Sequence, residues 1–160
     1  MISFKEKFTK EVIPKMKERF GYKNNLAVPR ILKVIVNTGT GKALKNEKMQ
    51  EMIAKNLAKI TGQKPIFTLA KKAISGFKTR KGMIIGLKVT LRGKRMYDFL
   101  DRLIKAALPR IRDFRGIPEK SIDKEGNLTI GVKEHIIFPE IAQEEIKILF
   151  GLEIAIVTNA

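Results

Sequence analysis

The chain has no cysteine and a single histidine, His135, and these two shortages exclude several kinds of site. Without cysteine there is no disulfide framework, thiolate nucleophile, iron–sulfur cluster or cysteine-ligated zinc. One histidine cannot build a multi-histidine metal site, so we interpret His135 as a structural or surface residue. The absence of cysteine also fits a reducing compartment. We therefore expect no metal and no other cofactor.

Long hydrophobic runs and a secretory leader are missing as well. The chain opens with MISFKEKF, which places charges where a signal peptide carries its apolar stretch. No run approaches the roughly 18 apolar residues that a membrane span needs. With 160 residues, of which 44% are hydrophobic, the chain can bury a core of its own. The sequence thus predicts a cytoplasmic protein without membrane contact, folded as a single domain over residues 1–160.

Acidic residues are few compared with basic ones. Lys and Arg total 33 against 16 Asp and Glu, which gives a formal net charge of +17 and a pI of about 10.2. Residues 52–97, here called the basic block, contain 12 basic side chains and no carboxylate, so their charges have no partner within the block. One interpretation is a solvated cationic face. The favoured one is a surface that binds the phosphates of a nucleic acid.

Hydrophobic periodicity predicts alternating helices and strands. Helices are expected at 4–20 with a break or kink at Pro14, at 49–60 closed by Gly62, at 96–107 ended by Pro109, and for a short stretch from Pro139. Strands are expected at 31–37, 65–69, 84–92 and 153–158, with a hairpin that joins 121–122 to 128–133. The result is an α+β fold: a mostly antiparallel sheet with helices on one face and a free face for a ligand.

Alternation within the predicted strands gathers polar side chains on that free face. Their ammonium and guanidinium groups bind phosphates, and their amides and hydroxyls bind riboses and base edges. An ordinary solvent-facing polar side is the alternative interpretation. The residues are Lys33, Asn37, Lys88, Thr90, Arg92, Thr129, Gly131 and Lys133.

Two further segments are cationic. Residues 71–82 carry five cations and two glycines without helix or strand periodicity, which predicts a projecting basic loop that orders on a polyanion. Phe77 within it either stacks on a base or anchors the loop to the core, and we favour the anchor. The segment PRIRDFRG forms another patch through Arg110, Arg112 and Arg115.

Two nucleotide-binding motifs of enzymes are approached by this sequence, but neither has the required residues at the required spacing. Residues 39–42 suggest a phosphate-binding loop, but the Walker pattern requires glycine where Val36 stands and Ser or Thr where Ala43 stands. The dinucleotide fingerprint fails because Leu44 occupies its third glycine position. Nothing indicates a catalytic carboxylate pair. We therefore assign no catalytic residue and expect a binding protein.

Four long blocks cover most of the chain: VPRILKVIVNTGTGKA (28–43), ITGQKPIFTLAKKAISGFKTRKGMIIGLKVTLRGKRMYDFL (60–100), LPRIRDFRGI (108–117) and GVKEHIIFPEI (131–141). Together they closely resemble bacterial-type large-subunit ribosomal protein five, the 5S-rRNA-binding family. The resemblance implies a non-enzymatic, structural component of the central protuberance that helps attach 5S rRNA to the large subunit. A basic RNA chaperone or regulator outside the ribosome is the alternative.

The resemblance also implies partners. On this sequence the 5S rRNA contacts fall on Asn37, Thr38, Gln63, Lys64, Thr90 and Arg92, to which alternation adds Lys33 and Lys88. The loop that approaches the peptidyl-site tRNA falls on Ser75, Gly76, Phe77, Lys78, Thr79, Arg80 and Lys81.

Further partners implied by the family are large-subunit rRNA, neighbouring central-protuberance proteins, and small-subunit ribosomal protein thirteen in an intersubunit bridge. The candidates for these contacts are the arginines of PRIRDFRG and the acidic C-terminal third of the chain. Relatives usually continue past Ala160 with a helical, Phe-containing tail that the printed sequence does not contain. Any contact made by such a tail is therefore in doubt, whereas the RNA-binding blocks are unaffected.

Overall fold

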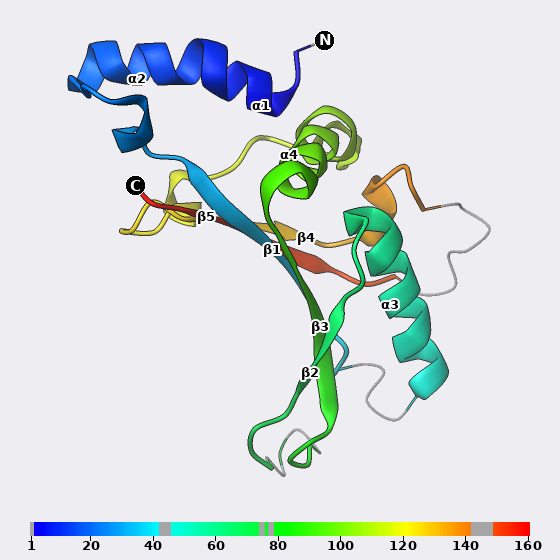
Figure 1. Cartoon of the computed structure of the whole chain (residues 1–160). Helices are drawn as coiled ribbons and strands as arrows, with labels where there is room; N and C mark the ends of the chain where they lie inside the picture. Colours follow the sequence, from blue (N-terminus) through cyan, green and yellow to red (C-terminus); the bar gives the residue numbers. More distant parts are fainter. Residues whose placement is uncertain (1, 42–45, 74–75, 77–78, 142–148) are drawn as a thin grey trace.

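The computed structural model describes residues 2–41, 46–73, 76, 79–141 and 149–160 (Figure 1). Its centre is a five-stranded sheet in the order β2-β3-β1-β5-β4, and every neighbouring pair is antiparallel. The predicted α+β fold with an antiparallel sheet is therefore confirmed. The strands are β1 (Ile31–Gly39), β2 (Ile66–Leu69), β3 (Ile84–Leu91), β4 (Leu128–Val132) and β5 (Leu152–Thr158).

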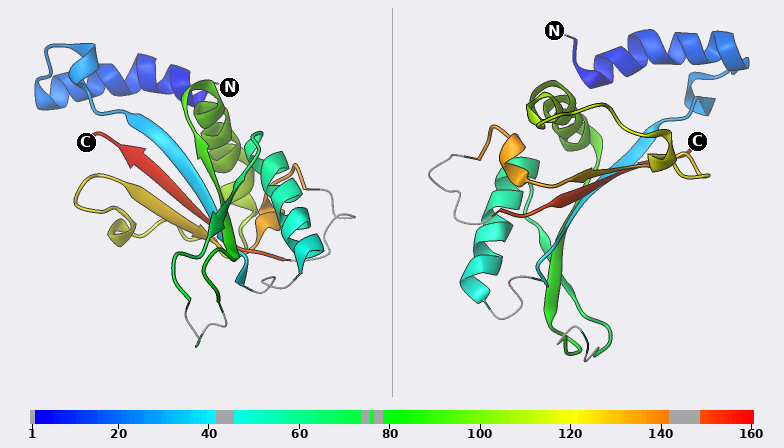
Figure 2. Two further views of the ribbon diagram at one scale, coloured as in Figure 1. Left: turned by 60° about the horizontal axis from the view of Figure 1, so that its bottom comes forward. Right: turned by 180° about the vertical axis from the view of Figure 1, so that it is seen from behind.

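Two helical regions cover one face of this sheet (Figure 2). α3 (Glu47–Thr61) begins at Asn46, whose side chain accepts a hydrogen bond from the backbone of Met49, and ends at Gly62 with φ of 74°. α4 (Gly93–Arg102) continues through a π-helical turn, Leu103–Ala107, and a 3₁₀ turn, Leu108–Arg110. Both predicted helices are thus confirmed, together with the glycine cap of the first.

The N-terminal helix keeps its apolar residues on one side by changing its winding. Phe4, Phe8 and Val12 recur every four residues, which exceeds the 3.6 residues of an α-helical turn. Between α1 (Phe4–Lys7) and α2 (Ile13–Phe20) lies a π-helical segment, Phe8–Val12, whose wider turn takes up the difference. All three side chains line one groove against α4 and β1.

Pro14 does not break this helix. It occupies the second position of α2, and Ile13 before it donates its backbone N–H to the carbonyl of Phe8, five residues back. Proline has no backbone N–H, so the wider π-helical turn lies where the regular series of α-helical hydrogen bonds is interrupted. The helical run continues to Phe20. Of the predicted break or kink at Pro14, the break is therefore wrong, and the winding changes immediately before this residue.

The core lies between the sheet and the two helical regions. Val34, Val36, Leu87, Val89 and Ile154 alternate along their strands and are almost fully buried against α3 and α4. From the helices, Leu57, Ile60, Phe99, Leu100 and Leu103 are equally buried. This continuous apolar layer fixes which face of the sheet is closed, and α3 and α4 leave the other face uncovered, as far as the described residues extend.

Ile104 and Ile85 share the spacing of the buried apolar residues in their predicted helix and strand, yet both lie outside this core. Ile104 is 45% exposed, because the change from α-helix to π-helix at Leu103 moves it off the buried stripe into the groove beside α1. Ile85 is 38% exposed, because β2 and β3 extend beyond the helices as an arm (Figure 1).

The predicted hairpin at residues 121–133 forms only in part. β4 is present and pairs with β5, but on its other side Ile122 makes a single bridge to Leu128. The turn itself is well formed: the carboxylate of Asp123 accepts hydrogen bonds from the backbone N–H groups of Glu125 and Asn127. The first strand is missing because the chain enters this turn from a 3₁₀ turn, Glu119–Ser121.

The short helix predicted from Pro139 lies mostly outside the described residues, since 142–148 are not among them. Pro139 and Glu140 form a turn after a 3₁₀ turn, His135–Ile137. The helix therefore stays a prediction.

Candidate nucleic-acid interface

The uncovered face of the sheet is here called the open face. The strand register aligns the predicted polar residues on it in rows that run across the strands. Asn37 on β1 lies opposite Lys88 on β3 and opposite Glu153 on β5, which in turn lies opposite Gly131 on β4. The next row joins Thr90, Ile35, Ala155 and Thr129. Polar faces that the sequence placed on separate strands thus meet on one surface.

The polar side chains on the open face are exposed or half-buried, whereas the core side chains on the covered face are buried. Asn37, Lys88 and Arg92 are exposed, and Lys33 and Thr90 are half-buried. Glu153 is the one carboxylate that the register places in the central row, where it faces Asn37. The surface therefore carries more cations than anions, mixed with amide and hydroxyl groups, and this chemistry suits phosphate and ribose contacts.

Thr38 does not belong to the open face. It lies opposite Leu87, on the covered side, and only 3% of it is exposed. Its hydroxyl donates a 2.7 Å hydrogen bond to the carbonyl of Gly151, next to the start of β5. Thr38 therefore lies on the other side of β1 from Asn37, and its side chain ties two segments together. Its predicted contact with 5S rRNA stays a prediction.

Gln63 is held beside the end of β3 by hydrogen bonds, and Lys64 follows it in the chain. The amide of Gln63 donates to the carbonyl of Thr90 at 3.0 Å, and its oxygen accepts from the guanidinium of Arg95 at 3.4 Å. Lys64, next to Gln63 in the chain, and Arg92, two residues after Thr90, are both exposed. The structure therefore brings Gln63, Lys64, Thr90 and Arg92 together, far apart as they are in sequence.

Arg95 is a member of this group that the sequence prediction did not select. Its side chain reaches Gln63 from the first turn of α4. The available signal was its place in the basic block, which does not distinguish one cation from another.

The basic block presents its charge to solvent. The ion pairs of Arg102 with Glu140 at 3.1 Å and of Lys105 with Asp101 at 3.2 Å both lie outside the block. The described cations of the block are all exposed: Lys55, Lys59, Lys64, Lys71, Lys72, Arg80, Lys81, Lys88, Arg92, Lys94 and Arg95. Such a surface attracts phosphate-rich partners strongly at low salt.

The predicted projecting loop lies at the tip of the arm formed by β2 and β3 (Figure 1). At its base, Ala70 donates to the carbonyl of Met83 at 2.8 Å, and Gly82 donates to the carbonyl of Ala70 at 2.9 Å. Arg80 and Lys81 are exposed beyond this closure. Three residues of the predicted tRNA-contacting set, Ser75, Phe77 and Lys78, lie outside the described residues.

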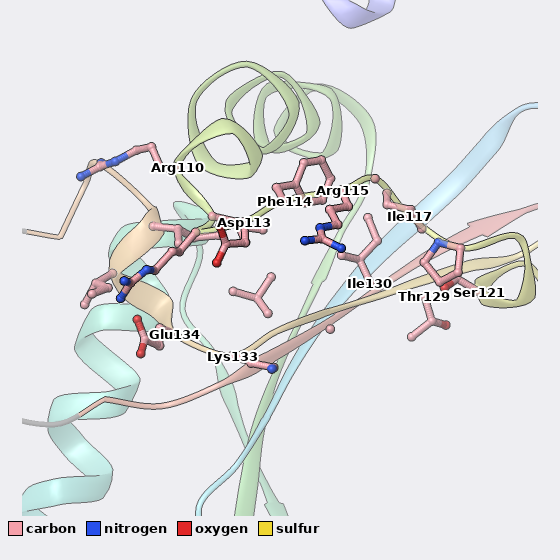
Figure 3. Close-up of a pocket in the computed structure, with 18 residues that line it drawn as sticks. Arg110, Asp113, Phe114, Arg115, Ile117, Ser121, Thr129, Ile130, Lys133 and Glu134 are labelled. Atoms are coloured by element: carbon pink, nitrogen blue, oxygen red, sulfur yellow. The ribbon is translucent and has the colours of Figure 1, made fainter.

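Of the three arginines of PRIRDFRG, Arg110 ends the 3₁₀ turn Leu108–Arg110, whereas Arg112 and Arg115 belong to a segment that stands away from the sheet edge. Residues 111–118, here called the arch, pass alongside β4, and residues 112–118 are all exposed. Positive φ angles at Asp113 (56°) and Gly116 (97°) bend the arch twice. A cavity of about 710 Å³ separates it from β4 (Figure 3). In that view Arg115 points toward Ile130, whereas Arg110 points away.

His135 is buried beneath Phe150. The two rings stack with centroids 3.9 Å apart, and the backbone N–H of Phe150 donates to Nδ1 of His135 at 3.4 Å. Burial lowers the pKa of His135 because an imidazolium ion would lose its hydration there. Of the two interpretations given for this residue, the structural one is therefore confirmed.

Within the described part of the chain, no group of three His, Asp or Glu side chains is arranged to hold a metal ion. A membrane-spanning helix is likewise not found among the described residues.

Comparison with known families and proteins gives consistent matches. The family model described as "Ribosomal protein L5" matches residues 24–80, and the model for the C-terminus of the same ribosomal protein family matches residues 84–160. Large ribosomal subunit protein uL5 of Streptococcus pyogenes serotype M5 is 54% identical over 156 residues, which cover 98% of this chain and 87% of the relative. The uL5 protein of Streptococcus thermophilus is 53% identical over the same shares.

Proposed function

The chain belongs to the ribosomal protein L5 family, and from this premise we propose that it binds 5S rRNA through the open face and helps to attach that RNA to the large ribosomal subunit. Membership makes the protein a non-enzymatic component of the large subunit of the cytoplasmic ribosome. The further step, from subunit membership to a particular RNA and a particular surface, is carried by the residues of the open face.

The observation that carries the proposal is the row of exposed polar residues at the centre of the sheet. Lys88 and Asn37 lie directly opposite each other and present an ammonium group and an amide side by side. At the end of the same strand, Arg92 and Lys64 add two exposed cations around the Gln63–Thr90 hydrogen bond. A folded RNA offers phosphates, riboses and base edges to such a surface, and the first of these contacts supply most of the affinity.

Other contacts extend the proposal to the rest of the ribosome. The loop at the tip of the β2–β3 arm, with Arg80 and Lys81, approaches the peptidyl-site tRNA. Arg110, Arg112 and Arg115 contact large-subunit rRNA. Small-subunit ribosomal protein thirteen and neighbouring central-protuberance proteins meet the chain near the arch and its acidic C-terminal third. These assignments are supported by exposed charge in each place and by family membership.

The test is a competition experiment with the full chain and labelled 5S rRNA at near-physiological salt. An excess of unrelated structured RNA should leave the 5S complex largely intact. The logarithm of affinity should fall linearly with the logarithm of salt concentration, because bound phosphates release counterions. If unrelated RNA displaces 5S rRNA equally well, the alternative of a general basic RNA chaperone or regulator is favoured.

Substitutions locate the contact. Lys88→Ala and Arg92→Ala should each weaken 5S binding and reduce the magnitude of the salt slope by about 1. Lys55→Ala removes the same charge from α3, on the covered side, and serves as the matched control. Arg80→Ala should spare isolated 5S binding and weaken tRNA contact in the assembled ribosome. Equal losses from all four variants would contradict the assignment of 5S rRNA to the open face.

A further inference from the structure

We propose that the cavity between the arch and the outer edge of β4 binds an unpaired nucleotide of a single-stranded RNA segment. The proposal rests on the proposed function in one respect, namely that RNA is the partner. The arch already carries the large-subunit rRNA contact of that proposal, and the present inference names the kind of RNA and the groups that would hold it there. β4 is the strand at the opposite end of the sheet from β2, so this contact lies far from Lys88, Lys64 and Arg92.

The first support is the outer edge of β4 itself. β4 ends the strand order, and among the described residues only the bridge from Ile122 to Leu128 uses its outer side. In an antiparallel strand, alternate residues direct both N–H and C=O to the same edge. Across Thr129–Val132 this edge therefore offers donor and acceptor groups side by side, which match the adjacent acceptors and donors on the edge of an unstacked base.

The second support is that the arch leaves this edge open. No hydrogen bond between described residues joins residues 111–118 to β4. The intervening cavity of about 710 Å³ falls in the size range of sites that hold small molecules. A segment that packed against β4 only for stability would pair with the edge, as Ile122 does at Leu128. The arch instead forms the second wall of a slot.

The third support is the chemistry of the walls. Arg112, Arg115 and Lys133 line the slot together with the carboxylates of Asp113 and Glu134, so cations outnumber anions. Guanidinium groups bind phosphates in a bidentate manner and also stack on bases, which makes arginine more suitable here than lysine. Arg115 points into the slot toward β4 (Figure 3).

Apolar wall residues complete the nucleotide site. Phe114 is 42% exposed and Ile117 is 38% exposed, although both belong to the lining of the slot. A ring in solvent beside arginines and a free strand edge provides a stacking surface for a base. A base-paired duplex cannot present a base to this slot, because its bases are stacked inside the helix. The expected ligand is therefore unpaired RNA.

The probe is a hexauridylate oligoribonucleotide that carries one 4-thiouridine, tested with the full chain beside an RNA duplex of twelve base pairs. Photo-crosslinking followed by peptide mapping should place the modified base on the arch or on β4. When affinity is compared at equal phosphate concentration, hexauridylate should bind more tightly than the duplex. Arg115→Ala and Phe114→Ala should each lower hexauridylate affinity by about fivefold or more.

Lys124→Ala is the matched control, because it removes one exposed charge from the turn outside the slot. Phe114→Leu separates ring stacking from simple apolar contact. Circular dichroism should give the same melting temperature for all variants, since the substituted side chains are exposed. Equal losses for Lys124→Ala and Arg115→Ala, crosslinks only outside the slot, or equal binding of the duplex would each overturn the proposal. Displacement of the crosslink by deca-glutamate at equal charge concentration would also overturn it, in favour of a site for an acidic peptide strand.

The two proposals fail separately. If 5S rRNA binds selectively and Lys88→Ala weakens it while hexauridylate never reaches the slot, the slot proposal is wrong and the proposed function stands. If hexauridylate crosslinks in the slot while 5S rRNA shows no advantage over unrelated RNA, the proposed function is wrong and the slot remains a site for unpaired RNA.

Discussion

Alternate residues of the same strands form the two faces of this sheet, and the two faces differ in their roles: one stabilises the fold and the other is exposed to solvent. Along β3, Leu87 and Val89 are buried under the helices, while Lys88 between them is exposed. The buried set provides the free energy of folding through removal of apolar surface from water. The exposed set contributes little to folding, so its chemistry is free to serve a ligand. A polar residue is therefore informative here only when its face is known.

Replacement of Leu87 by Ala should have the largest effect on stability. The side chain is completely buried between β1, β2 and the helices, so its truncation leaves a cavity. We expect a loss of about 2–5 kcal/mol in the free energy of unfolding. Urea denaturation followed by circular dichroism measures it. A loss below about 1 kcal/mol would show that the covered face is less tightly packed than the structure indicates.

Gly86→Ala should have an intermediate effect, although its position belongs to the open-face side of β3. A Cβ atom there would lie 2.8 Å from the carbonyl oxygen of Thr38 and 2.9 Å from Oγ1 of Thr68. The backbone contact cannot be relieved by a side-chain rotation, so we expect a loss of about 1–3 kcal/mol in unfolding free energy. Gly39→Ala is the control, because Gly39 pairs with Gly86 and an added Cβ meets nothing within 4 Å. Similar losses for both variants would rule out the steric explanation.

His135 should make the covered side sensitive to acid. Burial holds its pKa below the usual 6.5, so between pH 6.5 and that lower value the unfolded chain binds a proton that the folded chain refuses. Stability should therefore decrease as pH falls through this window, with a slope of at most about 1.4 kcal/mol per pH unit from this single group.

The comparison protein for this effect is His135→Gln, which cannot titrate there. Denaturant melts at a series of pH values from about 7.5 to about 5 should show the additional slope in the original protein only. Parallel pH profiles for the two proteins would mean that His135 can be protonated without unfolding.

Lys88→Ala should change stability least. Lys88 is exposed, and surface substitutions of this kind usually alter unfolding free energy by less than about 0.5 kcal/mol. The same substitution should weaken 5S rRNA binding, as described above. The comparison of the two faces would break down if Lys88→Ala destabilised the fold as much as Leu87→Ala does, one residue away.

Local patterns predicted most of the secondary structure and both faces of the sheet. Alternation around Val34 and Val36 is sufficient to assign Lys33 and Asn37 to the other face, because a strand has a period of two. The same rule places Thr38 with Val36, on the covered side. The family resemblance groups Thr38 with Asn37 among the ligand contacts, whereas the alternation assigns the two residues to opposite faces, as the structure has them.

Features that depend on contacts distant in sequence could not be predicted. The Gln63–Thr90 hydrogen bond joins a helix end to a strand, and neither residue carries a signal for the other. The arch has no periodicity, and its position beside β4 depends on the strand order. Residues 123–127 predicted the turn correctly. Turn chemistry does not determine whether the chain before the turn forms a strand, so the first strand of the hairpin was predicted wrongly.

The strand order has a consequence for the time course of folding. β1, the central strand of the sheet, is made early in synthesis, yet its neighbour β5 lies more than a hundred residues later in the chain. Pairings between such distant segments are slow to form, because a long loop must close first. During translation the basic block therefore emerges before the sheet that will order it can be completed. In a nascent chain of this protein, the basic residues are therefore exposed before the complete sheet, and with it the open face, has formed.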